Sequence, residues 1–235
     1  MAIARPLWQA LTLRVPVDGT TLNADLAIPV DAHGIVLFAH GSGSSRHNPR
    51  NQFVARVLQQ SDFGTLLMDL LNEKEEAVDN QTRELRFDIS LLSKRLTATV
   101  DWLSTQPAYK DLPVGIFGAS TGAAAALVTA ANRPVLVRSV VSRGGRPDLA
   151  DEALARVKAP TLLIVGAYDD AVLALNQQAM ARMKTRVELK IVPRATHQFE
   201  EPGALAQVAD SAAEWFWDNL RAKKPVASGQ NPDKT

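Results

Sequence analysis

The chain has 235 residues, 46% of them hydrophobic and 22% charged, which is the composition of a globular protein large enough for one sizeable core. A net charge of +1 gives no basic footprint for nucleic acid or for an anionic membrane, so neither is an expected partner. The lack of cysteine excludes disulfides, a thiol nucleophile and thiolate metal sites. No segment has the length of a membrane span, and the N-terminal residues lack the apolar core of a signal peptide, so we expect a cytoplasmic protein.

Strand-like and helix-like segments alternate along the chain. Two strand-like runs flank Asp18-Gly19, a pair typical of a hairpin turn, and predict an antiparallel edge. Apolar spacing at Ile89, Leu92 and Leu96 predicts a long amphipathic helix after the charged segment 72–86, which is too polar to be core. The predicted strands are 11–17, 22–28, 34–39, 63–68, a run beginning at 114, 135–141, 161–166 and 187–192. The other predicted helices are 51–60, a small-residue helix from 123, 149–157, 172–183 and 206–220.

This alternation predicts an α/β fold with a mostly parallel, doubly wound sheet of about eight strands and helices on both faces. Residues 1–222 are expected to form one domain, and residues 223–235, rich in Lys, Pro, Ser and Gly, a flexible C-terminal tail. Only about a dozen residues separate Val141 from Leu154 in the next helix, which leaves no room for a lid domain. In sheets of this kind the site lies at the carboxyl ends of the strands.

The segment Gly118-Ala119-Ser120-Thr121-Gly122 follows an apolar strand and leads directly into a helix of small residues. A Gly-x-Ser-x-Gly motif in this context is typical of a sharp turn that exposes a nucleophilic serine above the sheet. Glycines are needed at both ends because side chains there would collide with the neighbouring strand or helix. The sequence therefore predicts Ser120 as a catalytic nucleophile, with a plain strand–helix turn as the alternative.

A serine nucleophile needs a base and an acid that orients the base, and in sheets of this type they follow it in the chain. His197 is the one histidine of four that lies after Ser120, in a loop between the last strand and the last helix. The preceding strand ends before Asp169-Asp170, and either aspartate could cap the helix that follows. We predict that Asp169 orients His197 and that Asp170 caps the helix.

The tetrahedral intermediate of an acyl transfer needs two backbone N–H donors. One is predicted to come from Thr121, the residue after the nucleophile, and the other from Ser42 in the loop after His40-Gly41. The glycines of this loop are also compatible with a phosphate cradle, but the loop lacks the Gly-x-x-x-x-Gly-Lys pattern.

With these motifs in place, the chain resembles the α/β-hydrolase superfamily from about residue 11 to 220, and within it the dienelactone-hydrolase-like group. Two runs, His40 to Arg46 and Ser142 to Asp148, look like those of the hydrolase module sometimes fused to a phosphoribosyltransferase domain. This chain carries no such second domain, so no transferase activity is carried over. Dienelactone hydrolases proper use a cysteine nucleophile, and Ser120 departs from that pattern, so their lactone substrate is not carried over either.

The predicted function is a serine hydrolase that cleaves a carboxylic ester or related acyl bond of a small soluble substrate. An acyltransferase or thioesterase with the same triad is the alternative among enzymes, and a non-catalytic binding module is the alternative outside them. No cofactor is implied, and no cluster of His, Asp and Glu has metal-ligand spacing. Four arginines in loops at strand ends are candidate ligands of a substrate carboxylate or phosphate, with pairing to nearby acids as the alternative: Arg46, Arg50, Arg143 and Arg146.

Overall fold

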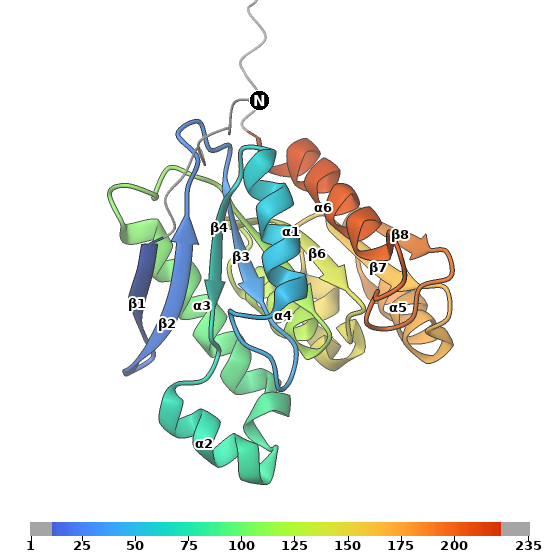
Figure 1. Cartoon of the computed structure of the whole chain (residues 1–235), viewed down its shortest axis with the longest axis horizontal. Coiled ribbons are helices and arrows are strands. Elements are labelled where there is room, and N and C mark those ends of the chain that lie inside the picture. Colours follow the sequence, from blue (N-terminus) through green and yellow to red (C-terminus); the bar gives the residue numbers. More distant parts are fainter. Residues whose placement is uncertain (1–10, 222–235) are drawn as a thin grey trace, which may run out of the picture.

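The eight strands form one sheet in the order β1-β2-β4-β3-β5-β6-β7-β8 (Figure 1). The hairpin of β1 and β2 pairs antiparallel with β4, and all other neighbours run parallel. The computed structural model describes residues 11–221, so the predicted tail 223–235 lies outside the described residues. The strands are β1 (Leu11–Val17), β2 (Thr20–Ala27), β3 (Ile35–Ala39), β4 (Gly64–Met68), β5 (Val114–Ala119), β6 (Val137–Arg143), β7 (Thr161–Gly166) and β8 (Val187–Val192). The predicted sheet and its antiparallel edge are confirmed.

Helices cover both faces of this sheet (Figure 1). One face carries α1 and α6, which pack on each other, and the opposite face carries α3, α4, α5 and the 3₁₀ helix η2. The helices are α1 (Pro49–Gln60), α2 (Glu73–Thr82), η1 (Leu85–Phe87), α3 (Ile89–Thr105), α4 (Thr121–Asn132), η2 (Pro147–Arg156), α5 (Asp170–Arg182) and α6 (Ala204–Leu220).

Burial on two faces explains the continuous apolar runs of the central strands. Every residue of β3, β4, β5 and β7 is buried, as expected of parallel strands between two helical layers. Phe38 and Phe117 lie side by side on the face covered by α1 and α6, with ring centroids 5.1 Å apart. Trp215 and Phe216 of α6 are buried on the same face.

One strand boundary differs from the prediction in a way that affects the site. Strand β6 begins at Val137 and ends at Arg143, two residues later than the predicted run 135–141. The N–H groups of Leu136 and Val137 donate to the carbonyl of Arg133 in a turn that closes α4, and Val135 is 82% exposed. The apolar run in the sequence thus begins two residues before the strand does. Because the strand also ends two residues later than predicted, Arg143 lies in the strand and not in the following loop.

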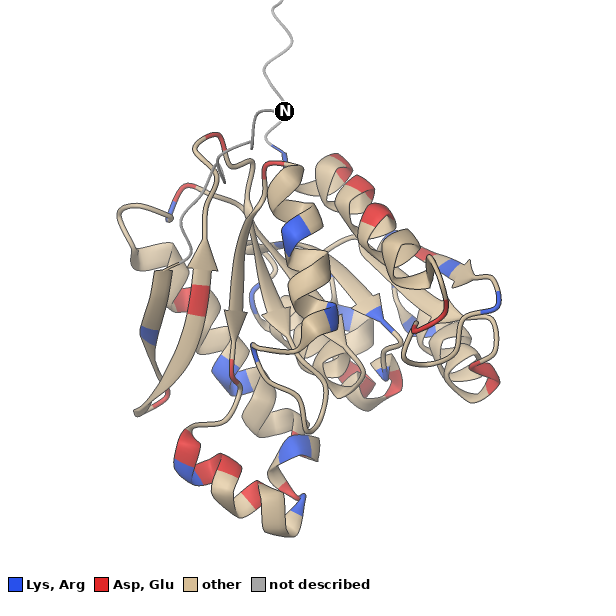
Figure 2. Ribbon diagram, in the orientation of Figure 1, with Lys and Arg blue, Asp and Glu red and all other residues tan. Residues whose placement is uncertain are grey.

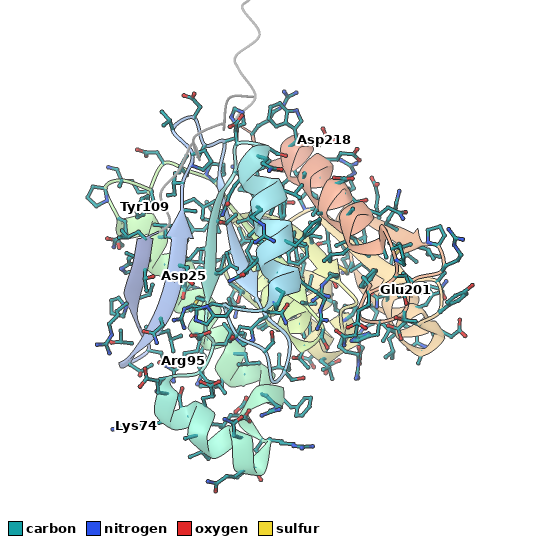
Figure 3. All side chains as sticks on the ribbon, viewed as in Figure 1. Asp25, Lys74, Arg95, Tyr109, Glu201 and Asp218 are labelled. Atoms are coloured by element: carbon teal, nitrogen blue, oxygen red, sulfur yellow. The ribbon has the colours of Figure 1, made fainter. Side chains whose placement is uncertain are left out.

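The charged segment 72–86 contains a helix, α2, that projects beyond the carboxyl ends of the strands (Figure 1). A capping box starts it: the Asn72 side chain accepts from the Glu75 N–H, and the Glu75 carboxylate accepts from the Asn72 N–H. Arg95 of α3 is buried and donates to Glu75 at 2.6 Å, whereas Lys74 is exposed (Figure 3). The connection between β6 and β7 holds only η2, so the expected lack of a lid domain is confirmed.

Lys and Arg are interspersed with Asp and Glu over the ribbon (Figure 2). Within this pattern Asp79 of α2 is a buried carboxylate, and Arg86 donates to it from Nε at 2.6 Å and from the backbone at 2.9 Å. Burial raises the pKa of Asp79, but the hydrogen bonds and charge of Arg86 outweigh it and hold the pKa below its ordinary value. This pair ties α2 to η1.

We predict that Asp79→Asn lowers the free energy of unfolding by ~1–3 kcal/mol at pH 7, because the Arg86 guanidinium loses its charged partner. A carboxyl whose pKa is depressed on folding stabilises the native state above its unfolded pKa and stops doing so as the pH falls through the folded value. The gap between wild type and variant, measured by urea unfolding, should therefore close as the pH is lowered below ~4.

The matched control for this prediction is Asp101→Asn. Asp101 also pairs with an arginine, Arg133, but its side chain is 42% exposed. Asp101→Asn should lower the free energy of unfolding by no more than ~1 kcal/mol, the usual contribution of a surface ion pair. Equal losses for the two variants would contradict a special contribution of the buried pair.

Candidate active site

Ser120 occupies a strained turn between β5 and α4, with φ 50° and ψ −122°. Both motif glycines are required by close contacts. A Cβ on Gly118 would lie 2.5 Å from Cα of Ala123, and one on Gly122 would lie 2.1 Å from the carbonyl oxygen of Ala39. The turn therefore has the geometry predicted from the motif, with strand β5 packed tightly against the start of α4 and Ser120 at the carboxyl end of the strand.

His197 lies within hydrogen-bond distance of Asp169, with Nδ1 of the imidazole 2.6 Å from Oδ2 of the carboxylate. Asp169 follows β7, and His197 follows β8, the neighbouring strand. The Asp169 side chain is 14% exposed and that of His197 35% exposed. This contact fixes the tautomer, because Nδ1 donates its proton to the carboxylate and leaves Nε2 as the acceptor.

The expected helix cap of Asp170 is wrong. The N-cap position of α5 belongs to Asp169, and no side chain caps this helix. Asp170 is instead the first residue of the helix and is exposed. The carboxylate of Asp169 contacts His197 and not the N–H groups at the start of the helix. A residue at this position usually caps the helix, but here its side chain is used for the contact with His197.

Two contacts hold the loop that carries His197. Glu201 accepts from the Thr196 hydroxyl at 2.6 Å and from the Thr196 N–H at 3.0 Å, and it is labelled in Figure 3. The hydrogen bond from the Thr196 side chain is the main reason that the pKa of Glu201 lies below its ordinary value. Gly166 lets the two loops approach, since a Cβ there would lie 2.3 Å from the carbonyl oxygen of Ala195. Glu201 was not among the predicted site residues; its one signal in the sequence is an acid four residues after the histidine.

The loop after β3 passes directly beside Ser120. A Cβ on Gly41 would lie 3.0 Å from Cβ of Ser120. The next N–H, that of Ser42, donates to Oγ1 of Thr121 at 3.1 Å. Thr121 is the first residue of α4, where N–H groups have no partner within the helix. The two backbone groups predicted as oxyanion donors thus belong to adjoining segments linked by the Thr121 hydroxyl.

His40 joins this loop to the segment that follows β4. The His40 imidazole is 9% exposed; its Nε2 accepts from the Leu70 N–H at 3.2 Å, and its Nδ1 lies 3.0 Å from the Gly41 carbonyl oxygen. Burial lowers the pKa of His40, and the Gly41 carbonyl with the charges of Asp69 and Glu76 only partly offsets this effect. A neutral ring with its proton on Nδ1 satisfies both contacts. From the sequence, His40 was expected only as part of a loop, and its role in joining two segments is a finding of the structure.

The segment of α2 and η1 packs against the same loop from the other side. A small pocket of about 60 Å³ separates them, lined by Ser42 to Ser45 on one side and by Glu76, Asp79 and Arg86 on the other. A Cβ on Gly43 would lie 2.8 Å from Nη1 of Arg86. The segment therefore supports the loop and contributes no residue to the pocket around Ser120.

Ser120 and His197 line one pocket of about 280 Å³. We call it the serine pocket. Its wall includes Ser42, Ser44, Arg50, Arg143 and Gln198, and among residues 11–221 no Asp or Glu lines it. The pocket is thus polar, and the arginines and lysines of the described residues contribute two cations to it, Arg50 and Arg143.

Two of the four candidate arginines are bound to acids outside this pocket. Arg46 forms ion pairs with Asp69 and, at 3.3 Å, with Asp25 of β2. Arg146 donates two hydrogen bonds to Asp148, at 2.9 and 2.7 Å, which raise its pKa. Neither lines the serine pocket. Arg46 and Arg146 are therefore not proposed as ligands of the substrate.

The other two arginines line the serine pocket, and they differ in whether an acid pairs with them. Arg50, the second residue of α1, pairs with the exposed Glu200 at 3.1 Å. Arg143 ends β6, is 8% exposed and makes no side-chain hydrogen bond or ion pair within residues 11–221; its Nε is buried without a partner. Burial, helped by the charge of Arg50, lowers the pKa of Arg143 to about 10, so it remains cationic at neutral pH.

Within the described part of the chain no group of three or more His, Asp or Glu side chains could hold a metal ion. Over the same residues no helix has the length and apolar character needed to cross a membrane.

Comparison with known proteins assigns the family. Residues 22–222 match the dienelactone hydrolase family. The chain belongs to this family. A dienelactone hydrolase from Anabaena variabilis is 57% identical, with a TM-score of 0.90 over 92% of this chain and 100% of that one. The resemblance inferred from the motifs is confirmed, and the chain has the α/β-hydrolase fold of this family.

Two other relatives show how far the likeness extends. A putative phosphoribosyl transferase from Mycobacterium tuberculosis is 56% identical over 211 residues, which are 90% of this chain and 46% of the relative. The chain thus spans about half the length of this curated relative, in line with the resemblance to a fused hydrolase module. Carboxyl esterase 2 from Tuber melanosporum shares 16% identity with a TM-score of 0.70, covering 93% of this chain and 90% of that one, which shows the common fold.

We predict that His40→Phe lowers the free energy of unfolding by ~1–3 kcal/mol at pH 7.5, because the buried Leu70 N–H loses its acceptor. A histidine whose pKa is lowered on folding stabilises the native state above its unfolded pKa of ~6.5, and the native state loses stability as the pH falls below that value. Urea unfolding at pH 7.5 and 5.5 should show the gap between wild type and variant shrinking at the lower pH. A gap that stays constant would mean that His40 is not held neutral.

Proposed function

We propose that the protein is a serine hydrolase that cleaves a carboxylic ester of a small soluble substrate through a Ser120–His197–Asp169 triad. The observation that carries the proposal is the 2.6 Å contact between His197 and Asp169, from the loops after two neighbouring strands, in a protein whose Ser120 shares a pocket with His197. Membership of the dienelactone hydrolase family supports ester-type chemistry. A cytoplasmic location and the absence of a nucleic-acid partner stay predictions.

The first half-reaction acylates the enzyme. Oγ of Ser120 attacks the ester carbonyl carbon while its proton passes to Nε2 of His197. The carbonyl electron pair moves to oxygen and returns as the bond to the alcohol breaks, and His197 gives its proton to the departing alkoxide. Asp169 stabilises the imidazolium that exists between these two transfers.

The second half-reaction releases the acid. Water attacks the acyl carbon and gives a proton to His197; the bond to Oγ then breaks, and the proton returns to Ser120. In both halves the oxyanion is held by the N–H groups of Ser42 and Thr121. An oxyanion is a stronger acceptor than the Thr121 hydroxyl that receives the Ser42 N–H at 3.1 Å, so it can take over this donor.

We predict that Ser120→Ala reduces the rate constant of ester hydrolysis by at least ~10³-fold while leaving the fold intact, because it removes the attacking oxygen. Intact mass after incubation with a fluorophosphonate probe gives an independent reading. Wild type should gain one adduct, and Ser120→Ala should gain none. A folded wild-type protein without an adduct would contradict the activated serine and favour a binding module on this fold.

We further predict that Asp169→Asn lowers the rate constant by ~10²–10⁴-fold, because an asparagine favours the wrong tautomer of His197. Asp170→Asn is the matched control: it changes the adjacent carboxylate, which is exposed and makes no contact with His197. Its rate constant should stay close to that of wild type. A reversed order of the two effects would assign the orienting role to Asp170.

The same triad would serve an acyltransferase or thioesterase, and product analysis separates these from a hydrolase. Hydrolysis is measured in the presence of an added alcohol or thiol acceptor. Products in which the acyl group is on the acceptor, formed faster than free acid, would replace hydrolysis by transfer as the activity. The polar pocket of about 280 Å³ favours a small substrate over a long acyl chain.

A further inference from the structure

The unsatisfied charge of Arg143 is the feature of the serine pocket that hydrolysis alone does not explain. Its side chain is more than nine-tenths buried, and within residues 11–221 its guanidinium has no carboxylate partner and no hydrogen-bond acceptor. Its Cζ lies 6.0 Å from the centroid of the Phe199 ring. A buried cation without a partner is strongly unfavourable, so proteins retain such groups chiefly at functional sites.

The surroundings of Arg143 favour an anion as the missing partner. Strand β6 brings Arg143 beside the nucleophile: residue 119 is its partner on β5, and its carbonyl oxygen accepts from the Ser120 N–H at 3.2 Å. Arg50 lines the same pocket and adds a second positive charge, and Ser44 has a buried hydroxyl without a partner. Among residues 11–221 no carboxylate lines the pocket; Glu200, which is exposed and lies outside it, pairs with Arg50, and no acid pairs with Arg143.

We propose that Arg143 forms an anion subsite of the serine pocket, which binds a carboxylate or phosphate group carried by the ester, with Arg50 assisting at its edge. The proposal rests on the proposed ester hydrolysis and adds to it the class of substrate. Planar guanidinium N–H groups match the oxygens of either anion. Arg143 rather than Arg50 carries the subsite, because Glu200 already pairs with Arg50.

The test compares esters that differ only in charge. On the acyl side, the mono-4-nitrophenyl ester of adipic acid is compared with the 4-nitrophenyl ester of adipamic acid, its neutral isostere. On the alcohol side, 4-acetoxybenzoate is compared with 4-acetoxybenzamide, and 4-acetoxyphenyl phosphate tests phosphate against carboxylate. For wild type we expect kcat/KM to favour the anionic member of at least one pair by ~10–100-fold, the usual effect of a charge-assisted hydrogen bond.

Arg143→Gln should abolish this preference, because it lowers kcat/KM for the anionic esters far more than for their neutral counterparts. Arg143→Lys keeps the charge and should retain part of the preference. The matched control is Arg146→Gln, which removes an arginine three positions away that is paired with Asp148 outside the pocket. Its preference should equal that of wild type.

Stability separates binding from a structural role. Removing an unpaired buried charge should leave the unfolding midpoint of Arg143→Met unchanged or raised, whereas loss of a structural contact would lower it. Equal kcat/KM for anionic and neutral esters in wild type, or an equal loss for both in Arg143→Gln, would overturn the anion subsite. Failure of wild type to hydrolyse any of the esters would instead overturn the proposed hydrolysis.

Discussion

The close packing of β5 against the start of α4 is the constraint on which the site depends. Ser120 has a positive φ that a non-glycine residue adopts only at a local cost of ~1–3 kcal/mol. The surrounding structure enforces this conformation: it leaves no room for a Cβ on Gly122, which would collide with the carbonyl oxygen of Ala39, or on Gly118, which would collide with Ala123. A fully buried strand and a small-residue helix supply the packing that offsets the strain.

Parallel strands bring the other site residues to the same edge of the sheet. Strand β3 ends at the loop of His40 and Ser42, while β7 and β8 end at the loops of Asp169 and His197. Each loop is held by contacts of its own: His40 fixes the first through Leu70, and Glu201 fixes the last through Thr196. Substantial parts of the site are thus positioned by side chains that do no chemistry themselves.

Charge is distributed unevenly over these loops. Arg46, Arg86 and Arg146 are satisfied by acids and hold segments together. Arg143 differs from them because it is buried in the serine pocket with no acid beside it. Most of these arginines thus pair with nearby acids, as is usual. Arg143 does not, and it lies next to the proposed nucleophile.

The sheet, its antiparallel edge, the turn at Ser120 and the family could all be predicted from the sequence, because strand alternation and the Gly-x-Ser-x-Gly turn are local patterns with few structural solutions. The sequence favoured Asp169 over Asp170 as the acid that orients His197, and it left four arginines as candidate ligands of an anion. Only the tertiary structure could separate these, since it decides which carboxylate faces His197 and which guanidinium meets an acid. The same holds for Arg143, which a two-residue shift of β6 moved from an expected loop into a buried strand end. The hydrophobic pattern of a segment predicts whether it is a helix or a strand. The partners of a polar side chain depend instead on residues that are distant in the sequence.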